Sequence, residues 1–300
     1  MIKPKELKNL YLNGCNIIQH LRAVDDHDYN TNDMIEMSYD LQAGSYTAAM
    51  NDTEMKKYKN IYTAELARII LSLCNPDSIL EAGVGEATTL SGVLKNIDKN
   101  ITSYGFDLSW SRVAYAKSWL EKKGIKNTTL CTGDLLNIPF SDNSIDVVYT
   151  SHSIEPNRGN EKEILQELFR VARKYLILLE PGYELVCDEA RKRMDLHGYC
   201  RNLKSEAESL GYKILTHELF PVSVNPLNAT AITVIEKLTT DPMPLYVLTC
   251  PQYKNKLDLI GGMLFSEEAL SVYPVLGGIP CLRKDNAIIA SHYKEFSQDF

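Results

Sequence analysis

The segment Ser-Ile-Leu-Glu-Ala-Gly-Val-Gly-Glu-Ala-Thr at residues 78–88 begins as an apolar strand, continues through a glycine turn and ends in the start of a helix. Glycine lets the backbone approach a ligand closely, and the first turn of a helix offers unpaired N–H groups to it. Open α/β sheets bind their ligands in the crevice at the carboxyl ends of the strands. The segment therefore predicts a ligand site at the end of this strand.

The residues of the turn limit the kind of ligand. A dinucleotide fingerprint requires glycine at the position of Thr88 and a P-loop requires Gly-Lys-Ser/Thr, and this turn has neither. Glu81 stands two positions before the first glycine, where its carboxylate repels phosphate and attracts a cation or an amine. The turn therefore favours a cationic ligand over a pyrophosphate.

Two further acids follow neighbouring predicted strands. Asp107 ends the next strand after the turn, and Asp134 follows the third. An acid about twenty residues beyond such a turn is placed to accept hydrogen bonds from ribose hydroxyls. The alternative is that each aspartate only caps the helix that follows it.

Apolar runs alternate with helical patterns from residue 78 onward, which predicts βαβ crossovers and a mostly parallel sheet covered on both faces. We expect an α/β, doubly wound, Rossmann-like fold with a small α+β module at the C-terminus. The predicted strands are 79–82, 101–106, 128–131, 145–149, 175–179, 213–219 and 231–236. The predicted helices are 60–72, 88–95, 109–122 and 160–173.

Residues 78–181, within a domain of about 60–238, resemble a class I S-adenosylmethionine-dependent methyltransferase. The turn at 81–87 is similar to the first motif of that family, with Ala87 in place of its usual third glycine, and 139–148 resembles the stretch that leads into its fourth strand. The resemblance implies S-adenosyl-L-methionine as the cofactor. The cofactor-binding residues that it implies are Glu81, Gly83, Gly85, Asp107, Leu108, Asp134, Leu135, Ser151, Tyr39 and Tyr46.

The same resemblance implies which of these residues contacts each part of the cofactor. Glu81 and the glycines line the methionine part, Asp107 holds the ribose, and Asp134 with Leu135 borders the adenine. Residues 1–59 are expected to form a helical lid segment over the cofactor. Two tyrosines of this segment, at 39 and 46, can contact the sulfonium through their rings, although ordinary packing of aromatic side chains is an equal alternative.

The loops after the fourth and fifth strands are where the acceptor is expected to enter. His152 is the predicted general base because its ordinary pKa near 6.5 permits proton acceptance at neutral pH. Glu155 or Glu180 can orient it, and a histidine that is only hydrogen-bonded within its loop is the equal alternative. Asn157 and Arg158 are candidate substrate contacts. The loop lacks the Asp/Asn-Pro-Pro-aromatic signature of relatives that methylate adenine amino groups.

A basic run at 191–204 has five fixed positive charges against one negative charge. Arg191 and Arg201 of this run are therefore candidate substrate contacts, and they would suit a small molecule with a carboxylate or a phosphate. Tyr183, in the loop after the fifth strand, is a further candidate contact. A solvated helix face is the more usual meaning of such a run.

The chain after residue 238 is expected to be a separate module. Residues 239–244 contain two prolines and turn-forming residues, which predict a linker before a module at 245–300. The module resembles the zinc-ribbon activator family that partners tRNA, rRNA and release-factor methyltransferases. The positions that hold zinc ligands in that family are here Cys250, Tyr253, Ser266 and Ala269. One thiolate cannot hold a structural zinc ion, so we predict no metal.

The overall composition indicates a globular cytoplasmic protein. Lys and Arg number 32 against 39 Asp and Glu, and the net charge of −7 disfavours nucleic acid as a partner. No apolar run reaches the roughly 18 residues that span a bilayer, so no membrane association is expected. The seven cysteines include no CxxC pair and are expected to be reduced. A homo-oligomer is compatible with this composition.

Three functions remain open at this point. The first is an enzyme that methylates O or N of a small metabolite, such as a sugar or a natural-product intermediate, which is anionic if the basic run faces it. The second is an RNA or protein methyltransferase with its activator fused to it. The third is a non-catalytic scaffold that binds S-adenosylmethionine.

Overall fold

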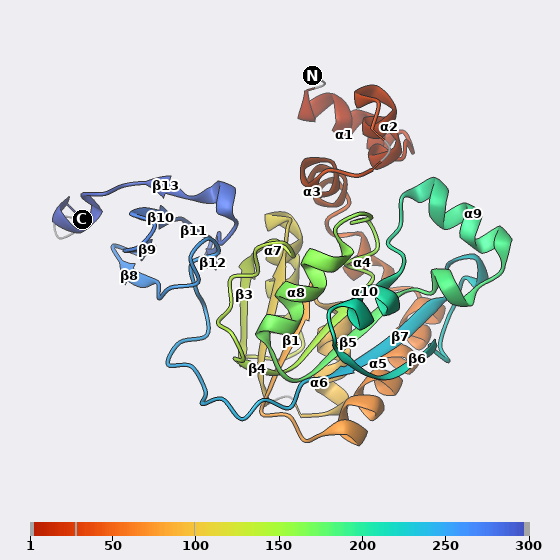
Figure 1. Ribbon diagram of the computed structural model, residues 1–300. Helices are drawn as coiled ribbons and strands as arrows, with labels where there is room; N and C mark the ends of the chain where they lie inside the picture. The colour runs from red at the N-terminus through yellow and green to blue at the C-terminus, as the bar shows by residue number, and fades with distance from the viewer. Residues whose placement is uncertain (1–2, 28, 99, 297–300) are drawn as a thin grey trace.

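The computed structural model describes residues 3–27, 29–98 and 100–296. A seven-stranded sheet forms its centre, in the order β3-β2-β1-β4-β5-β7-β6 (Figure 1). The strands from β3 to β5 run parallel, and β7 pairs antiparallel with both β5 and β6. The strands are β1 Ser78–Ala82, β2 Thr102–Asp107, β3 Thr128–Thr132, β4 Ile145–Ser151, β5 Ala172–Pro181, β6 Lys213–Leu219 and β7 Thr230–Glu236. The predicted doubly wound α/β fold is confirmed.

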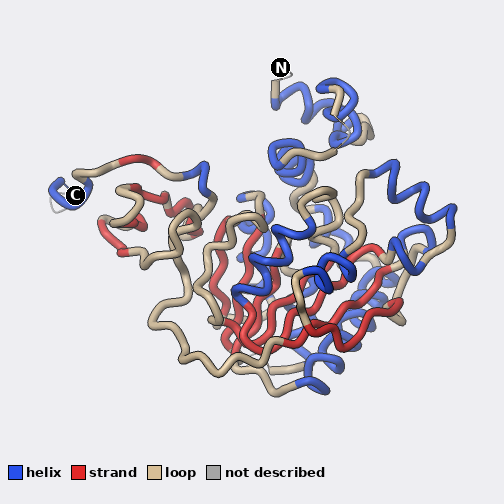
Figure 2. Tube along the Cα trace, in the orientation of Figure 1, coloured by secondary structure: helices blue, strands red, loops and turns tan. Residues whose placement is uncertain are grey.

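Helices cover both faces of this sheet (Figure 2). One hydrophobic core joins Ile79 and Val147 of the sheet to α5, α6 and α7, and the other joins Leu80 and Val148 to α8 and α10. Adjacent strand residues point to opposite faces, so both faces of β1 and β4 are apolar and buried. These helices, with α9 beyond the sheet, are α5 Thr53–Leu73, α6 Thr88–Asn96, α7 Trp110–Lys122, α8 Glu161–Val171, α9 Asp188–His197 and α10 Leu203–Ser209.

The predicted helix at 160–173 ends earlier than expected. Ala172 pairs with Ile145 of β4 and begins β5, so the last two residues of the predicted helix belong to the sheet. Backbone pairing with a buried strand outweighs the helical pattern of the side chains there. The other predicted elements of the sheet domain differ from the observed ones mainly at their ends.

The segment before the sheet is helical and lies above its carboxyl edge in Figure 1. It contains α1 Pro4–Leu12, α2 Ile17–Asp25, α3 Asn32–Leu41 and α4 Ser45–Ala49. The expected boundary at residue 59 falls inside α5, and the division into domains stays a prediction. Among the described residues, no helix combines the length and the apolar character needed to cross a bilayer.

The chain passes from Glu236 to Asp258 without a helix or a named strand and then forms a small module beside β3 (Figure 1). The module has a four-stranded antiparallel sheet in the order β13-β10-β9-β8 and a β11–β12 hairpin. Its elements are β8 Asp258–Ile260, β9 Met263–Ser266, β10 Ser271–Tyr273, β11 Val275–Leu276, β12 Ile279–Pro280, β13 Ile288–Ile289 and α11 Tyr293–Phe296. Short 3-10 turns lie at Tyr183–Leu185 (η1), Pro226–Asn228 (η2) and Lys284–Asn286 (η3).

The module packs against the end of β3 and reaches the N-terminal helices. Cys281 bridges to Thr132 in the parallel sense, and the Leu282 N–H donates to the Thr132 carbonyl at 3.2 Å. The next residue, Arg283, is only 8% exposed and forms an ion pair with Glu36 of α3. The module therefore contacts the sheet and α3 at once.

We expect Arg283→Met to loosen α3. A partly buried ion pair contributes about 1 kcal/mol, so amide exchange across α3 should become roughly fivefold faster. Hydrogen exchange followed by mass spectrometry measures this directly. Lys117→Met is the control, because Lys117 of α7 donates to the Gly277 carbonyl of the module at 2.9 Å, a bond that joins the module to α7 and not to α3. Equal exchange of α3 in the two variants contradicts the anchoring role of Arg283.

Candidate functional site

The glycine turn after β1 has backbone conformations that favour glycine. Gly83 and Gly85 have φ of 74° and 52°, and Ala87 also has a positive φ of 56°. A Cβ at position 83 would lie 2.2 Å from the Cβ of Ser153, so only glycine fits against the loop after β4. The Ser153 hydroxyl donates to the Ala82 carbonyl at 2.7 Å and holds this loop against the turn.

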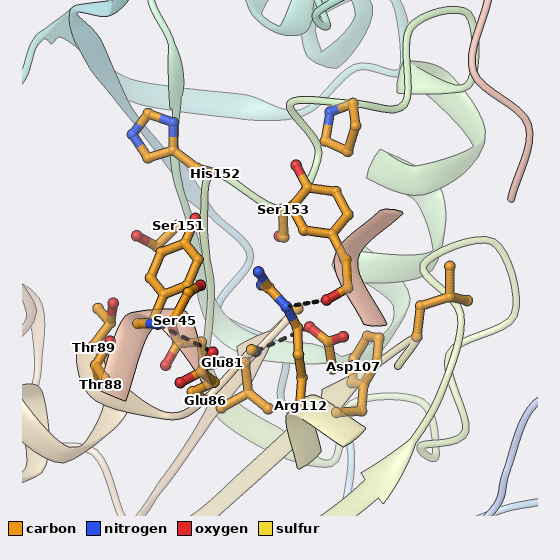
Figure 3. A pocket seen from close by; sticks show the side chains of 18 of the residues that line it. Ser45, Glu81, Glu86, Thr88, Thr89, Asp107, Arg112, Ser151, His152 and Ser153 are labelled. Carbon is orange, nitrogen blue, oxygen red and sulfur yellow. Dashed lines mark hydrogen bonds between the residues drawn. The ribbon is translucent and has the colours of Figure 1, made fainter. Parts of the chain in front are cut away.

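A cavity of about 470 Å³ opens between this turn, the ends of the strands and the N-terminal helices. Its lining includes all the residues that the sequence predicts to bind the cofactor, which are Glu81, Gly83, Gly85, Asp107, Leu108, Asp134, Leu135, Ser151, Tyr39 and Tyr46. His152 and Asn157 line it as well. Figure 3 shows Glu81, Asp107, Ser151 and His152 around this space.

Glu81 lies at the bottom of the cavity and is 2% exposed. Tyr149 donates a hydrogen bond to its carboxylate at 3.0 Å. Burial raises the pKa of Glu81 to about 8, although the nearby Lys59 ammonium opposes this rise. A cationic group placed beside Glu81 would favour its charged form.

The aspartates of the cavity do not cap helices. Ser109 is the N-cap residue of α7, and Asp107 instead accepts hydrogen bonds from the N–H groups of Gly85 and Ser109 at 2.9 and 3.0 Å. Asp134 accepts from the Leu136 N–H at 2.9 Å and from the Asn32 side chain at 2.8 Å. Burial raises the pKa of both aspartates. The capping alternative is therefore wrong for both residues.

Arg112 is a residue of the cavity that the sequence analysis missed. Its guanidinium lies 4.7 Å from the ring centre of Tyr39 and 4.8 Å from that of Tyr46, and its Nε donates to the Tyr39 carbonyl at 3.1 Å. Its Nη2 is buried without a hydrogen-bond partner among the described residues. The position five residues after Asp107, at the start of the following helix, is the sequence signal that would have pointed to it.

Glu86 is a second residue that the sequence analysis missed. Its carboxylate accepts hydrogen bonds from the N–H groups of Gly44, Tyr46 and Thr47, at 2.9, 3.2 and 2.6 Å, at the start of α4. The side chain is 2% exposed. A residue of the glycine turn therefore holds α4, and with it Tyr46, over the cavity.

The loop after β4 is held by two carboxylates. His152 has a positive φ of 58°; its Nδ1 contacts the Glu155 carboxylate and its Nε2 lies 2.9 Å from the Thr230 hydroxyl. Burial opposes the charged imidazolium, but the Glu155 carboxylate outweighs it and raises the pKa of His152. Glu180 accepts from the N–H groups of residues 153, 154 and 155, and burial raises its pKa to about 7.

The remaining predicted substrate contacts gather elsewhere. Arg158 and Arg201 approach one carboxylate oxygen of Asp195 at 3.2 and 3.7 Å, and Tyr183 donates to the other at 3.0 Å. Arg191 donates to the Tyr183 carbonyl at 3.1 Å. These four residues do not line the cavity, whereas Asn157 does.

The four positions that correspond to zinc ligands form hydrogen bonds or lie exposed. The Cys250 thiol lies 3.3 Å from the Tyr273 hydroxyl, and the Ala269 N–H donates to the Ser266 hydroxyl at 3.1 Å. Tyr253 is 55% exposed. Within the ranges that the structure describes, no three His, Cys, Asp or Glu side chains are grouped to hold a metal ion.

Comparison with known proteins identifies the central region. Residues 79–175 match the family model described as "Methyltransferase domain". Demethylmenaquinone methyltransferase of Anoxybacillus flavithermus is 29% identical over 86 residues, which cover 29% of this chain and 33% of that protein. Norajmaline N-methyltransferase of Rauvolfia serpentina is 30% identical over 171 residues, which cover 56% of this chain and 50% of that protein. The chain thus spans a third to a half of these relatives.

A solved structure supports the fold. Magnesium protoporphyrin IX methyltransferase from Synechocystis PCC 6803, with bound SAH, aligns with a TM-score of 0.53 and 12% identity over 69% of this chain and all of that one. At this identity the match concerns the fold alone. The match at residues 79–175 shows that the chain contains a methyltransferase domain, and S-adenosylmethionine is the cofactor of that domain.

The side chains of the cavity fit this cofactor chemically. A buried carboxylate suits its amine, a carboxylate at the end of β2 suits its ribose hydroxyls, and the apolar side chains of Leu108 and Leu135 suit a purine. Burial raises the pKa of Glu81 despite the nearby Lys59, and a cationic ligand would oppose this rise further.

We expect Gly83→Ala to abolish binding of S-adenosylhomocysteine in calorimetry, because the new methyl group displaces the loop that carries Ser153. Gly124→Ala is the matched control: Gly124 has a similar φ of +69° but open space around it. The control should lose only the roughly 1–2 kcal/mol of stability that a left-handed non-glycine residue costs. Equal behaviour of the two variants would show that the contact with Ser153 is unimportant.

The pKa of Glu81 predicts a dependence of stability on pH. Its value of about 8 in the folded protein lies above its ordinary value of 4.5, so the folded state binds more protons between these pH values. The free energy of unfolding should therefore fall as pH rises from 4.5 to 8, by up to about 1 kcal/mol per pH unit from this group. Glu81→Gln should flatten the slope in denaturant titrations. Parallel curves for the two proteins contradict the assignment.

Proposed function

We propose that the whole chain is a methyltransferase that transfers the methyl group of S-adenosylmethionine to O or N of a small molecule. The observation that supports this most is the cavity that brings the glycine turn together with Glu81, Asp107 and Asp134. Two relatives that the chain matches are named for the acceptors demethylmenaquinone and norajmaline.

The cofactor supplies an activated methyl group, and the chain holds it in place. In our proposal Glu81 and the glycines hold the methionine part, Asp107 the ribose hydroxyls, and Asp134 with Leu135 the adenine. Tyr39 and Tyr46, from α3 and α4, lie over the same cavity. The N-terminal helices then act as a lid that excludes water from the reacting atoms.

His152 is the proposed general base. Glu155 at its Nδ1 fixes the tautomer that leaves Nε2 free to accept a proton, and Nε2 now faces the Thr230 hydroxyl. Glu180 is a positioning residue in this proposal, because its carboxylate is occupied by three backbone N–H groups of the loop. Because its pKa is raised, His152 keeps its proton to a higher pH than an ordinary histidine does. It can therefore act as a base only at a pH above the ordinary pKa of histidine.

The C-terminal module has a supporting role in this proposal. Arg283 joins it to α3, and α3 carries Asn32, which donates to Asp134. The module thereby holds one end of the lid at the edge of the cofactor cavity. Its likeness to a zinc-ribbon activator with lost ligands remains part of this proposal, as does a cytoplasmic location.

The test is binding followed by transfer. We expect calorimetry to show binding of S-adenosylhomocysteine, and labelled S-adenosylmethionine to pass its methyl group to a component of a metabolite pool. His152→Gln should keep binding and lower the transfer rate about a hundredfold, the range of general base catalysis. His217→Gln is the control, because His217, on the outer strand β6, lies with its Nδ1 2.9 Å from the Thr233 hydroxyl of β7, in the way that His152 contacts Thr230.

The outcomes separate the alternatives. Binding without transfer to any pool component indicates the non-catalytic scaffold, and transfer to RNA or protein indicates the macromolecular enzyme. Binding of NADH or ATP without binding of S-adenosylhomocysteine ends the proposal.

A further inference from the structure

A second cavity of about 390 Å³ adjoins the cofactor cavity. It lies between the N-terminal helices, the loop after β4 and the end of α9. Tyr39, Tyr46 and Pro156 line both cavities and form a common wall. Its volume is in the range of small-molecule sites, which run from about 300 to 1,000 Å³.

The wall of this cavity is rich in aromatic rings. Tyr11 and Tyr199 line it in addition to the two shared tyrosines, and His197 stacks on Tyr199 with ring centres 5.2 Å apart. Such surfaces suit a ligand with a flat face, because ring faces attract through stacking and area burial.

Fixed positive charge lies behind the wall of this cavity and not in its lining: the Arg193 guanidinium is 6.0 Å from the ring centre of Tyr199, and Arg112 packs on Tyr39 and Tyr46 from the cofactor side. Among the residues that line it in the described chain there is no lysine or arginine, and Glu155 is the one carboxylate. Glu155 is itself hydrogen-bonded to His152, Tyr199 and Asn228. Burial of a carboxylate or phosphate without a cation is costly. The arginines at 158 and 201, which might have met an anion, are paired with Asp195 outside this cavity.

One hydrogen-bond acceptor in the described part of the wall remains available. Asn30 is 2% exposed; its Nδ2 donates to the Pro156 carbonyl at 2.8 Å, and its Oδ1 has no partner among the described residues. An unpaired buried amide oxygen costs free energy that a hydrogen-bond donor on a ligand would recover. A hydroxyl or amino group can act as that donor, and a carboxylate cannot.

We infer that the second cavity is the acceptor site and that it takes an uncharged molecule with a flat face and hydroxyl or amino groups, and without a carboxylate or phosphate. This inference rests on the proposed methyltransferase function. The methyl group then passes where Tyr39 and Tyr46 divide the two cavities: the bond from the sulfonium sulfur to the methyl carbon breaks as the bond from the acceptor O or N to that carbon forms. S-adenosylhomocysteine stays in the cofactor cavity, and the acceptor's proton goes to the proposed base His152, which lines that cavity. The Arg112 guanidinium, packed on both rings, positions that wall from the cofactor side.

The test uses catechol and 3,4-dihydroxybenzoate as probes, which share a ring and hydroxyl groups and differ in one carboxylate. Protein loaded with S-adenosylhomocysteine is examined by saturation-transfer NMR. We expect catechol to bind at least tenfold more tightly than the benzoate. Gln42→Arg adds a cation to the cavity wall and should reverse this preference, whereas Gln252→Arg, on the exposed surface of the module, should not change it.

The location is tested by thiol protection. Cys15 lines the second cavity. The other cysteines that are not buried in the described structure are Cys74 and Cys187, so replacing these two with serine leaves Cys15 as the thiol that a reagent can reach. Catechol should slow alkylation of Cys15 by N-ethylmaleimide at least fivefold. Alkylated protein should still bind S-adenosylhomocysteine, because Cys15 does not line the cofactor cavity.

Three results overturn the inference: equal or tighter binding of the benzoate to the unaltered protein, no binding of either probe at millimolar concentration, or binding of catechol without protection of Cys15. If S-adenosylhomocysteine fails to bind while catechol protects Cys15, the proposed methyltransferase function fails and the chemistry of the second cavity stands. Binding of S-adenosylhomocysteine with failure of the probes leaves the function intact and rejects the acceptor class.

Discussion

The close approach of Gly83 to Ser153 is the contact on which the site depends. There is no space for a side chain at position 83, and the Ser153 hydroxyl donates a hydrogen bond to the carbonyl of Ala82. Glu180 holds the same loop from β5 through three N–H groups. The loop after β4 is therefore bonded both to the end of β1 and to β5, and these bonds fix the positions of the strand ends that line the cavity.

A second constraint is electrostatic. Three acids at the ends of neighbouring strands are buried, and burial alone favours their neutral forms. A cation from a different element of the chain lies near each acid and opposes this effect. The pairs are Glu81 with Lys59, Asp107 with Arg112, and Asp134 with Arg283. The charge balance of the site thus depends on α5, on α7 and on the C-terminal module, and a cationic ligand competes with Lys59 for Glu81.

The parts that the sequence predicts well are those that follow from the order of the strands. Asp107 ends β2 and Asp134 follows the neighbouring parallel strand β3, so the topology alone brings them to one edge with Glu81. Arg112 and Glu86 acquire their roles only when α3 and α4 pack against α7 and the glycine turn. Their partners lie 39 to 73 positions earlier in the chain, and no local pattern predicts that packing. The same limit explains the basic run. A count of charges cannot show that Arg158 and Arg201 both form ion pairs with Asp195 in the folded chain.

The two ends of the proposed lid are held by different parts of the molecule. Arg283 of the C-terminal module pairs with α3, while Glu86 of the glycine turn accepts three N–H groups at the start of α4. The tyrosines that divide the cavities belong to these same two helices. Any motion that widens the wall must break buried, charge-assisted hydrogen bonds on one side or an ion pair at the other. α3 is held in addition by the bond from Asn32 to Asp134, by the bond from the Ser109 hydroxyl to Asp40 and by the bond from Arg112 to the Tyr39 carbonyl, so the ion pair of Arg283 is one of several contacts that fix this end of the proposed lid.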